Sequence, residues 1–326
     1  MTGNLMKIGI IYDQIKDYEH INGPEDRFAE FEPESTIEAM KDAVKMTGHT
    51  PVDIGSPRNL LTPPDIDLAW NIAEGYGTRN REAWAPVLLE MHQIPYFGSD
   101  AATLSVSLDK HLTRLIAQSS GIPVAWGEAV ARPENLQEIS VPAYPLLLKP
   151  RFEGTAKGIN RASIVKNRKE LEKKVPELIK TYDQDVLIEQ FLPGAEFTCL
   201  VVGNPLRSLP VVQRSVDRES RLGVHALSGN GEIPEEDQVL PGLLDDELEQ
   251  LLISQSLRMC RDMKVRHFAR IDFKMDEFGQ PFFLEINPLP TFAVDSTLAV
   301  ISEMQGKNYI DFLAELLNEI IKDARS

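Results

Sequence analysis

The sequence predicts an α/β fold with two or three domains, the first of them built on a parallel sheet. Strand-like and helix-like segments alternate over roughly the first hundred residues, and this β-α-β order is typical of a parallel sheet with helices on its faces. The 326 residues are enough for two or three domains with their own cores. Hydrophobic residues make up 42% of the chain and no segment is of low complexity, which argues against disorder.

The first domain begins with a β-branched run, "KIGIIY" at residues 7–12, which predicts a strand. The helix that follows has a capping box formed by Ser35 and Glu38, apolar residues at positions 37, 40 and 44, and Gly48 at its expected end. Strands at 50–54 and 65–72, a helix at about 81–91 and the segment "IPYFGS" continue the alternation.

The middle of the chain has a different character. A helix at about 108–119 leads to an apolar strand at 144–150, and the glycine-bearing loop "RFEGTAKGI" follows it. A strand at 162–166, a charged helix at about 168–180 and a strand at 185–191 come next.

The last third contains a predicted hairpin, in which "EFTCLVVG" turns at "NPL" into the return strand "SLPVV". Residues 213–237 are polar and aperiodic, with glycines at 223, 229 and 231, and long irregular segments are usually functional or mobile. We therefore expect a lid there. A helix at about 245–263, with leucines 248, 251, 252 and 257 on its apolar side, and an amphipathic helix at 309–324 complete the chain.

Composition narrows the class of protein. Cys199 and Cys260 lie in apolar surroundings, which favours buried free thiols over a disulfide or a metal site. The net charge of −16 offers no basic face for nucleic acid. No apolar run is long enough to span a bilayer, and the first residues do not resemble a signal peptide. We expect a cytoplasmic protein with small-molecule partners.

The segment "ARIDFKMDEFGQPFFLEINPLP" predicts a second hairpin, with Gly279 in its turn. Alternate residues of a strand share a face, which groups Arg270, Asp272 and Lys274 on one strand and Phe283, Glu285 and Asn287 on the other. If those faces coincide, two carboxylates, an amide oxygen and a guanidinium converge. Oxygen ligands suit Mg²⁺, and the absence of nearby Cys or His disfavours zinc. The alternative is a solvated polar face.

A second motif is "LLLKPRFEGTAKGI". Lys149 ends an apolar strand, and the following loop contains Gly154 and Gly158. A lysine charge and backbone N–H groups together suit a phosphate. An ordinary surface turn is the alternative reading.

Taken together, these segments resemble the ATP-grasp superfamily and, within it, the D-alanine-D-alanine ligase family. The matching blocks run in the family's order: "GYGTRNREAWAPVLLEMHQIPYFGSD", "SLDKHLTRLIAQSSGIP", "LLKPRFEGTAKGI", "VLIEQFLPGAEFT" and "RIDFKMDEFGQPFFLEINPLPTFAVDS". The resemblance implies three domains: an α/β substrate domain at 1–103, a central ATP-grasp subdomain with the phosphate loop at 104–190, and a C-terminal subdomain with the metal site and lid at 191–326. The ATP-grasp part is expected to be α+β.

The resemblance also implies a role for individual residues. Lys110 and Lys149 match the lysines that contact ATP phosphates, Glu189 the residue that holds the adenine amino group, and Glu196 the ribose ligand, while backbone groups near Phe191 and Leu192 complete the adenine contact. Asp272, Glu285 and Asn287 match the Mg²⁺ ligands, with Mn²⁺ as an alternative metal. Arg270 matches the arginine that stabilises the tetrahedral intermediate, Thr155 replaces a serine of the phosphate loop, and Ser296 matches a serine that holds a substrate carboxylate.

The implied activity is ligation of a carboxylate to an amine through an acylphosphate. ATP activates the carboxylate, an amine attacks and phosphate leaves, so the protein mainly positions groups and neutralises charge. The partners would be amino-acid or small carboxylate and amine substrates, with no nucleic acid and no membrane. A homodimer is left open.

The sequence departs from the family pattern on the substrate side. Glu74-Gly75 stands where the family has a histidine-glycine pair, Thr291 replaces a glycine, and the lid lacks the family's lysine-tyrosine pair. Arg218, Arg221 and His225 are candidate lid contacts, although for any one of them a solvated charge is the favoured reading. Glu32 and Glu34 are candidates for binding the substrate's amino group, or else acids that stabilise the start of the helix.

These departures leave three readings: a D-alanine-D-alanine ligase-type enzyme, a ligase of other amino acids or amines in a specialised pathway, and a non-catalytic nucleotide-binding paralogue. The complete metal set, Arg270 and both lysines argue against the last.

Overall fold

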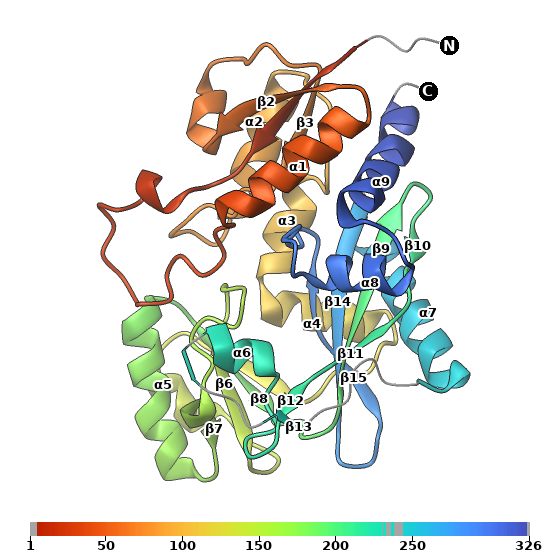
Figure 1. Cartoon of the computed structure of the whole chain (residues 1–326). Helices are drawn as coiled ribbons and strands as arrows, with labels where there is room; N and C mark the ends of the chain where they lie inside the picture. Colours follow the sequence, from red (N-terminus) through yellow and green to blue (C-terminus); the bar gives the residue numbers. More distant parts are fainter. Residues whose placement is uncertain (1–4, 230, 233–235, 238–243, 325–326) are drawn as a thin grey trace.

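The fold is that of a computed structural model, which describes residues 5–229, 231–232, 236–237 and 244–324. Figure 1 shows a sheet at the N-terminal end and two other large sheets below it, with helices packed around them. Helices α1 (Glu34–Met46) and α9 (Tyr309–Ala324), which come from opposite ends of the chain, pack against each other.

The predicted parallel sheet is confirmed. It comprises β1 (Lys7–Ile11), β2 (Thr50–Gly55), β3 (Leu68–Asn71) and β4 (Tyr96–Phe97), in the order β2-β1-β3-β4. All of its pairs are parallel. Helix α2 (Trp84–Met91) and the short 3-10 helices η1 (Ile15–Asp17), η2 (Pro57–Leu61) and η3 (Arg81–Ala83) connect these strands.

The predicted apolar face of α1 is confirmed, because residues 37, 40 and 44 are buried. The predicted capping box is wrong. The helix begins at Glu34 and is preceded by Pro33, so Ser35 is already inside the first turn and makes no capping bond. A proline at this point fits, because it has the extended backbone of a cap and lacks an N–H to satisfy. Gly48 follows the helix with φ +81°, as its C-terminal role requires.

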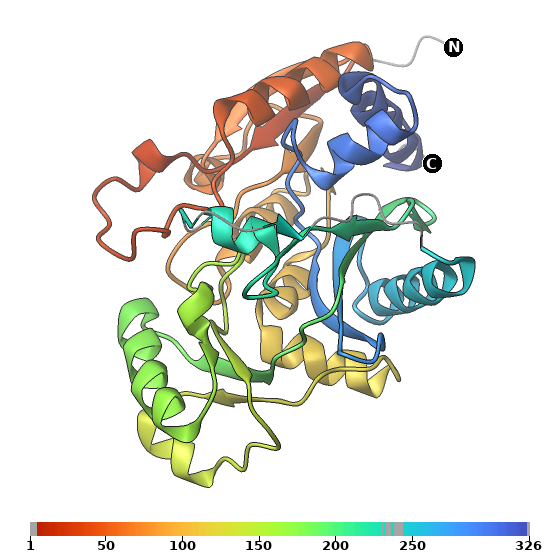
Figure 2. The ribbon, with the colours of Figure 1, turned by 60° about the horizontal axis from the view of Figure 1, so that its bottom comes forward.

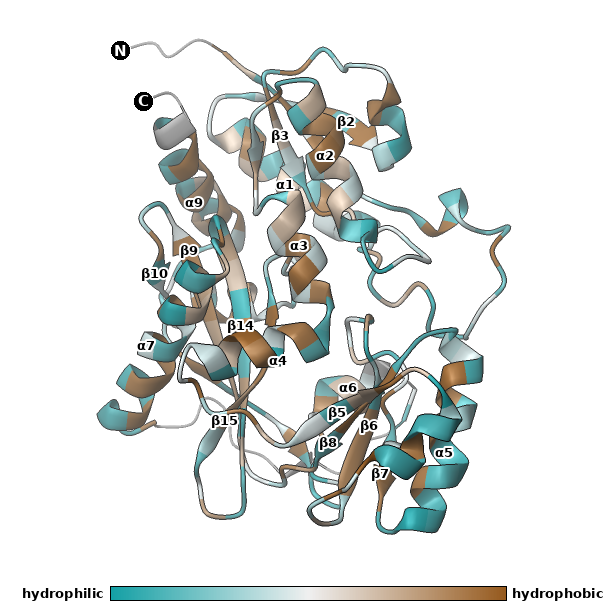
Figure 3. Cartoon of the chain, turned by 180° about the vertical axis from the view of Figure 1, so that it is seen from behind, coloured by the Kyte–Doolittle hydropathy of each residue, from teal (hydrophilic) through white to brown (hydrophobic). Residues whose placement is uncertain are grey.

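The central sheet is antiparallel. It consists of β5 (Gly127–Val130), β6 (Leu146–Pro150), β7 (Ile164–Val165) and β8 (Val186–Gln190), in the order β5-β8-β6-β7. Helix α5 (Arg168–Tyr182) packs against it, and the 3-10 helices η4 (Pro133–Glu138) and η5 (Arg161–Ser163) lie in its connections. Figure 3 shows β6 as hydrophobic and much of α5 as hydrophilic, as expected for a strand under a helix that also faces solvent.

The C-terminal sheet contains both predicted hairpins. Its main strands are β9 (Glu196–Gly203), β14 (His267–Met275) and β15 (Pro281–Asn287), with β10 (Arg207–Ser208) and β11 (Val212–Arg214) both paired to β9. Helix α7 (Asp246–Asp262) packs on this sheet. Of its predicted apolar residues, Leu252 is fully buried but Leu251 is 39% exposed, so its assignment to the buried side is wrong.

The helix predicted at about 108–119 is confirmed, and a further helix that was not predicted precedes it. Helix α3 (Ala101–Leu108) and helix α4 (Lys110–Ser119) meet at Asp109, whose carboxylate accepts hydrogen bonds from the backbone N–H groups of His111 and Leu112. Both helices pack against β15. Helix α8 (Thr297–Met304), which the sequence did not reveal, precedes α9.

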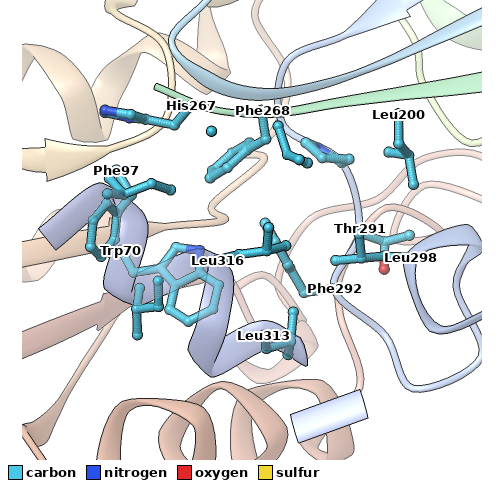
Figure 4. A pocket seen from close by; sticks show the side chains of 15 residues that line it. Trp70, Phe97, Leu200, His267, Phe268, Thr291, Phe292, Leu298, Leu313 and Leu316 are labelled. Carbon is cyan, nitrogen blue, oxygen red and sulfur yellow. The ribbon is translucent and has the colours of Figure 1, made fainter. Parts of the chain in front are cut away.

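An apolar core joins the N-terminal sheet to the C-terminal sheet and α9. Figure 4 shows Trp70 and Phe97 from the first sheet facing Phe268 and Phe292, with Leu313 and Leu316 of α9 beside them. The ring of Phe292 lies 5.1 Å from Trp70 and 5.1 Å from Phe268, both edge to face. The central sheet lies apart from this core, as the turned view in Figure 2 also shows. The domain boundaries inferred from the sequence remain a prediction.

Candidate active site

The hairpin of β14 and β15 brings the predicted polar residues together. Arg270 pairs with Asn287 and Asp272 pairs with Glu285, so their side chains share one face. The register shifts directly after Asp272, which places Phe283 opposite Phe273. Both phenylalanines belong to a buried cluster on the other side. The expectation that Phe283 shares a face with Glu285 is therefore wrong, because a β-bulge breaks the alternation.

Arg270 lies between the two carboxylates. Its Nε donates to Asp272 at 2.9 Å and its Nη2 to Glu285 at 3.3 Å, while Thr198 donates to the other oxygen of Asp272 at 2.7 Å. Burial raises the pKa of Asp272. Burial also acts to raise the pKa of Glu285, but the charges of Lys110 and Arg270 outweigh it and lower that pKa to about 2. Glu285 is therefore ionised at neutral pH.

The same residues fit a magnesium ion that a phosphate completes. Asp272 and Glu285 offer two carboxylates, and Asn287 lies beside them with an amide oxygen that accepts from the Leu289 N–H at 2.9 Å. In the described part of the chain no three His, Cys, Asp or Glu side chains form a complete metal cluster. Mg²⁺ is commonly held by only one or two carboxylates plus substrate phosphates, so this donor set suits it.

Lys149 and Glu189 form a buried ion pair. The Nζ of Lys149 lies 2.6 Å from one carboxylate oxygen of Glu189, and Nη1 of Arg114 lies 2.8 Å from the other. Sequence reasoning missed Arg114. The spacing of Arg114 on α4 could have indicated it, because it lies one turn after Lys110 and both side chains face inward.

An open cleft with about 1290 Å³ of free space lies between the central and C-terminal sheets, and we refer to it as the nucleotide cleft. Most of the predicted nucleotide and catalytic residues line it, namely Lys110, Lys149, Thr155, Glu189, Phe191, Leu192, Glu196, Arg270 and Glu285. The structure thus gathers side chains that are up to 175 positions apart in the sequence. Asp272, Asn287 and Ser296 do not line this cleft.

Glu196 is held in the nucleotide cleft by a residue that the sequence did not single out for this purpose. The Nζ of Lys274 lies 3.1 Å from Glu196, and the Nδ1 of His225 lies 3.6 Å from its other oxygen. Burial acts to raise the pKa of Glu196, but the charge of Lys274 outweighs it and lowers that pKa.

The phosphate loop is bound to the N-terminal segment. The N–H of Gly154 donates to Glu30 at 2.6 Å, and the N–H of Gly158 donates to Asp26 at 2.9 Å. A Cβ at Gly154 would lie 2.4 Å from the Glu30 carboxylate, so only glycine allows this approach. Thr155 has φ +46°, a strained value for a β-branched residue. The loop's contact with phosphate remains a prediction.

The residues predicted to hold substrate do not line the nucleotide cleft. Ser296 caps α8, accepting from the N–H of Ala299 at 3.4 Å. Glu34 is exposed at the start of α1. Glu32 accepts from the Thr36 hydroxyl at 2.9 Å, and burial raises the pKa of its carboxyl. None of the three lines the pockets around Arg270.

Sequence reasoning also missed a buried charge cluster. Arg81 donates to both oxygens of Glu30, at 2.7 and 2.8 Å, and Lys157 forms an ion pair with the same carboxylate. The charges of these cations outweigh the effect of burial and lower the pKa of Glu30 to about 2. Glu30 and Lys157 come from segments without periodicity, so no pattern could have paired them.

The segment predicted as a lid contains regular secondary structure in its described part. It contains β12 (Val216–Asp217), β13 (Glu236–Asp237) and α6 (Val224–Gly229), while residues 230 and 233–235 lie outside the described part. Leu222, Gly223, His225 and Ala226 line the nucleotide cleft. Of the candidate contacts, Arg221 donates to the backbone oxygen of Pro193 at 3.0 Å and Arg218 is exposed.

We expect this segment to exchange its amide hydrogens faster without ligand than with it. Residues of this segment line the nucleotide cleft, and closing of the predicted lid over ATP would exclude water from an acylphosphate. Hydrogen exchange with and without ATP and substrates measures this, with helix α5 as the internal control. Equal exchange in the two states would contradict a lid function.

Two antiparallel sheets around a lysine-lined cleft, with an acidic hairpin at one wall, define an ATP-grasp protein. The sequence model described as "D-ala D-ala ligase C-terminus" matches residues 116–318, more than half of the chain. The chain therefore belongs to the D-alanine–D-alanine ligase family, whose members are ADP-forming, ATP-dependent ligases.

Individual relatives agree with this assignment. The D-alanine–D-alanine ligase of Carboxydothermus hydrogenoformans is 28% identical over 297 residues, covering 86% of this chain and 91% of the relative. The ATP complex of the Bacillus anthracis D-alanine–D-alanine ligase has a TM-score of 0.72 at 21% identity and covers 98% of both chains. The VanG D-Ala:D-Ser ligase of Enterococcus faecalis has a TM-score of 0.71 at 17% identity, covering 97% of this chain and 99% of that one. The two structures show the shared fold.

Within the described residues, none of the helices has the length and apolarity needed to cross a membrane.

Proposed function

We propose that this protein joins a carboxylic acid to an amine in an amide bond, through an acylphosphate, and that its substrates are not two D-alanines. The observation that carries the proposal is the convergence of Lys110, Arg270 and Glu285 where two cavities meet. One is the nucleotide cleft; the other, the acidic pocket, is lined by Glu30, Glu74, Glu82, Ser107, Leu108, Lys110, Gly154, Thr155, Arg270, Glu285, Ile286 and Asn287. An acid in the acidic pocket would lie beside a phosphate in the cleft.

Different side chains would carry out different parts of such a reaction. Lys110 and Lys149 would bind phosphate oxygens as positive charges, and Glu196 would accept hydrogen bonds from ribose hydroxyls. Asp272, Glu285 and Asn287 would hold Mg²⁺, which neutralises phosphate charge when bound. Arg270, already placed between these carboxylates, would donate to the oxyanion formed when the amine attacks. No protein nucleophile is required.

The altered substrate side supports the second part of the proposal. The acidic pocket carries Glu74 where the family resemblance implies a histidine, and Glu30 is already neutralised by Arg81 and Lys157. A pocket that lacks a substrate's hydrogen-bonding partners loses discrimination for that substrate steeply. Relatives with this fold include one named for D-Ala and D-Ser, so a different amine has a precedent.

We expect D-alanyl-D-alanine formation to be weak or absent. The measurement is phosphate release from ATP and Mg²⁺ over pairs of D- and L-amino acids, with product identified by mass spectrometry. A rate for D-alanine alone near the usual enzyme median of roughly 10 per second would overturn the altered specificity. ATP binding without phosphate release from any pair would instead favour a nucleotide-binding paralogue.

A further inference from the structure

The acidic pocket contains two carboxyl groups that the proposed reaction has not used. Glu74 and Glu82 both line it, beside Arg270 and Glu285. Glu82 is 6% exposed and lies within hydrogen-bonding distance of Glu74. Buried carboxyl groups are costly unless paired, so their presence at a reaction pocket calls for a partner.

The cations around the pocket are already engaged elsewhere. Arg81 and Lys157 form ion pairs with Glu30, and Arg270 and Lys110 with Glu285. Among the described residues neither Glu74 nor Glu82 forms an ion pair. They are therefore carboxyl groups of this pocket without a direct ion pair, although the charge of Arg81 acts on both of them.

Two adjacent carboxylates favour sharing a proton, which would leave the pair with one negative charge. Burial raises the pKa of both groups, in agreement with this. A single ammonium group would balance the charge and provide the donors that the second carboxylate needs.

We propose that Glu74 and Glu82 together bind the ammonium group of the acid that is activated, and so select an amino acid over an uncharged carboxylic acid. The inference rests on the proposed ligase function. It assigns the substrate's positive charge to Glu74 and Glu82 rather than to Glu32 or Glu34, which lie outside the pocket.

The test uses hydroxylamine as the amine, so that the unknown acceptor does not matter. The acylphosphate formed from the acid and ATP reacts with hydroxylamine to give a hydroxamate and phosphate, and the hydroxamate is measured. D- and L-alanine are compared with D- and L-lactate, and D- and L-serine with D- and L-glycerate. Each pair differs by replacement of an ammonium with a hydroxyl group.

Wild type should favour the amino acids. The double variant E74Q/E82Q should lose about 10- to 100-fold in kcat/KM for them, mostly through KM, because hydrogen bonds to charged groups contribute roughly 1.5–3 kcal/mol. Its kcat/KM for the hydroxy acids and its ATP affinity should remain within about twofold of wild type. E134Q, at an exposed glutamate, is the matched control. An unchanged preference, or equal losses with both kinds of acid, would overturn the proposal.

A second readout needs no turnover. Removing buried charges that serve a ligand should leave the melting temperature unchanged or raise it, whereas removing a structural pair should lower it. A fall in the melting temperature of E74Q and E82Q would overturn the inference. If no acid yields a hydroxamate, the ligase proposal itself fails, and the melting temperatures still decide the role of the pair.

Discussion

Replacing Glu285 by glutamine is expected to lower kcat by roughly 100-fold or more, a loss typical of removing one group that stabilises transition-state charge. Glu285 faces Asp272 across the hairpin and is ionised by virtue of Lys110 and Arg270. Glutamine keeps the shape and one oxygen but removes the charge that would hold Mg²⁺ against phosphate. The Mg²⁺ concentration needed for half-maximal rate should rise as well.

The measurement is ADP release at saturating ATP and substrate, with Mg²⁺ varied. E303Q, at an exposed glutamate of α8, is the matched control and should behave as wild type. Circular dichroism would verify that E285Q is folded. Full activity of a folded E285Q protein would remove the metal-site interpretation of the hairpin.

Replacing Lys149 by alanine is expected to weaken ATP binding by about 10- to 100-fold, the loss for a hydrogen bond to a charged group. Lys149 is 2% exposed and lines the nucleotide cleft, so its charge acts in a site of low dielectric constant. The fold should survive, because Arg114 still neutralises Glu189 after the lysine is removed. Titration calorimetry with ATP measures the affinity.

K180A is the control for this variant, since Lys180 is an exposed lysine of α5. K149R should recover part of the affinity if charge is the essential property. An ATP affinity of K149A equal to that of wild type would show that Lys149 serves only to neutralise Glu189.

Much of the fold could be predicted because apolar and polar residues alternate regularly along its strands and helices. The prediction failed where the backbone is irregular. The hairpin of β14 and β15 followed from apolar alternation and Gly279, and Asp272 and Glu285 do face each other. The bulge beside Asp272 could not be foreseen, because one extra residue leaves no mark in a short apolar strand. Helix α3 was not predicted, because the expected helix began only at about residue 108. The side-chain cap at Asp109 separates α3 from α4.

Site residues that lie in or at the end of a strand could be predicted from the sequence. Site residues that lie in loops were harder to predict. Lys149 was identified from the strand before it, yet its pairing with Glu189 joins β6 to β8 and depends on the strand order. Glu30 lies in a segment without periodicity, and its partners are 51 and 127 positions away. Its importance becomes visible only when the N-terminal segment is folded over the phosphate loop.

The apolar core around Trp70 and Phe292 has a consequence for protein engineering. The N-terminal sheet rests on Phe268 and Phe292 and on α9, so its natural unit is discontinuous in sequence and includes the last helix. A chimera that takes only the first hundred residues from a relative would set foreign side chains against this α9 and leave gaps or clashes. Exchanging the first hundred residues together with residues 309–324 would transfer both sides of the contact. The two ends of the gene should therefore be exchanged together.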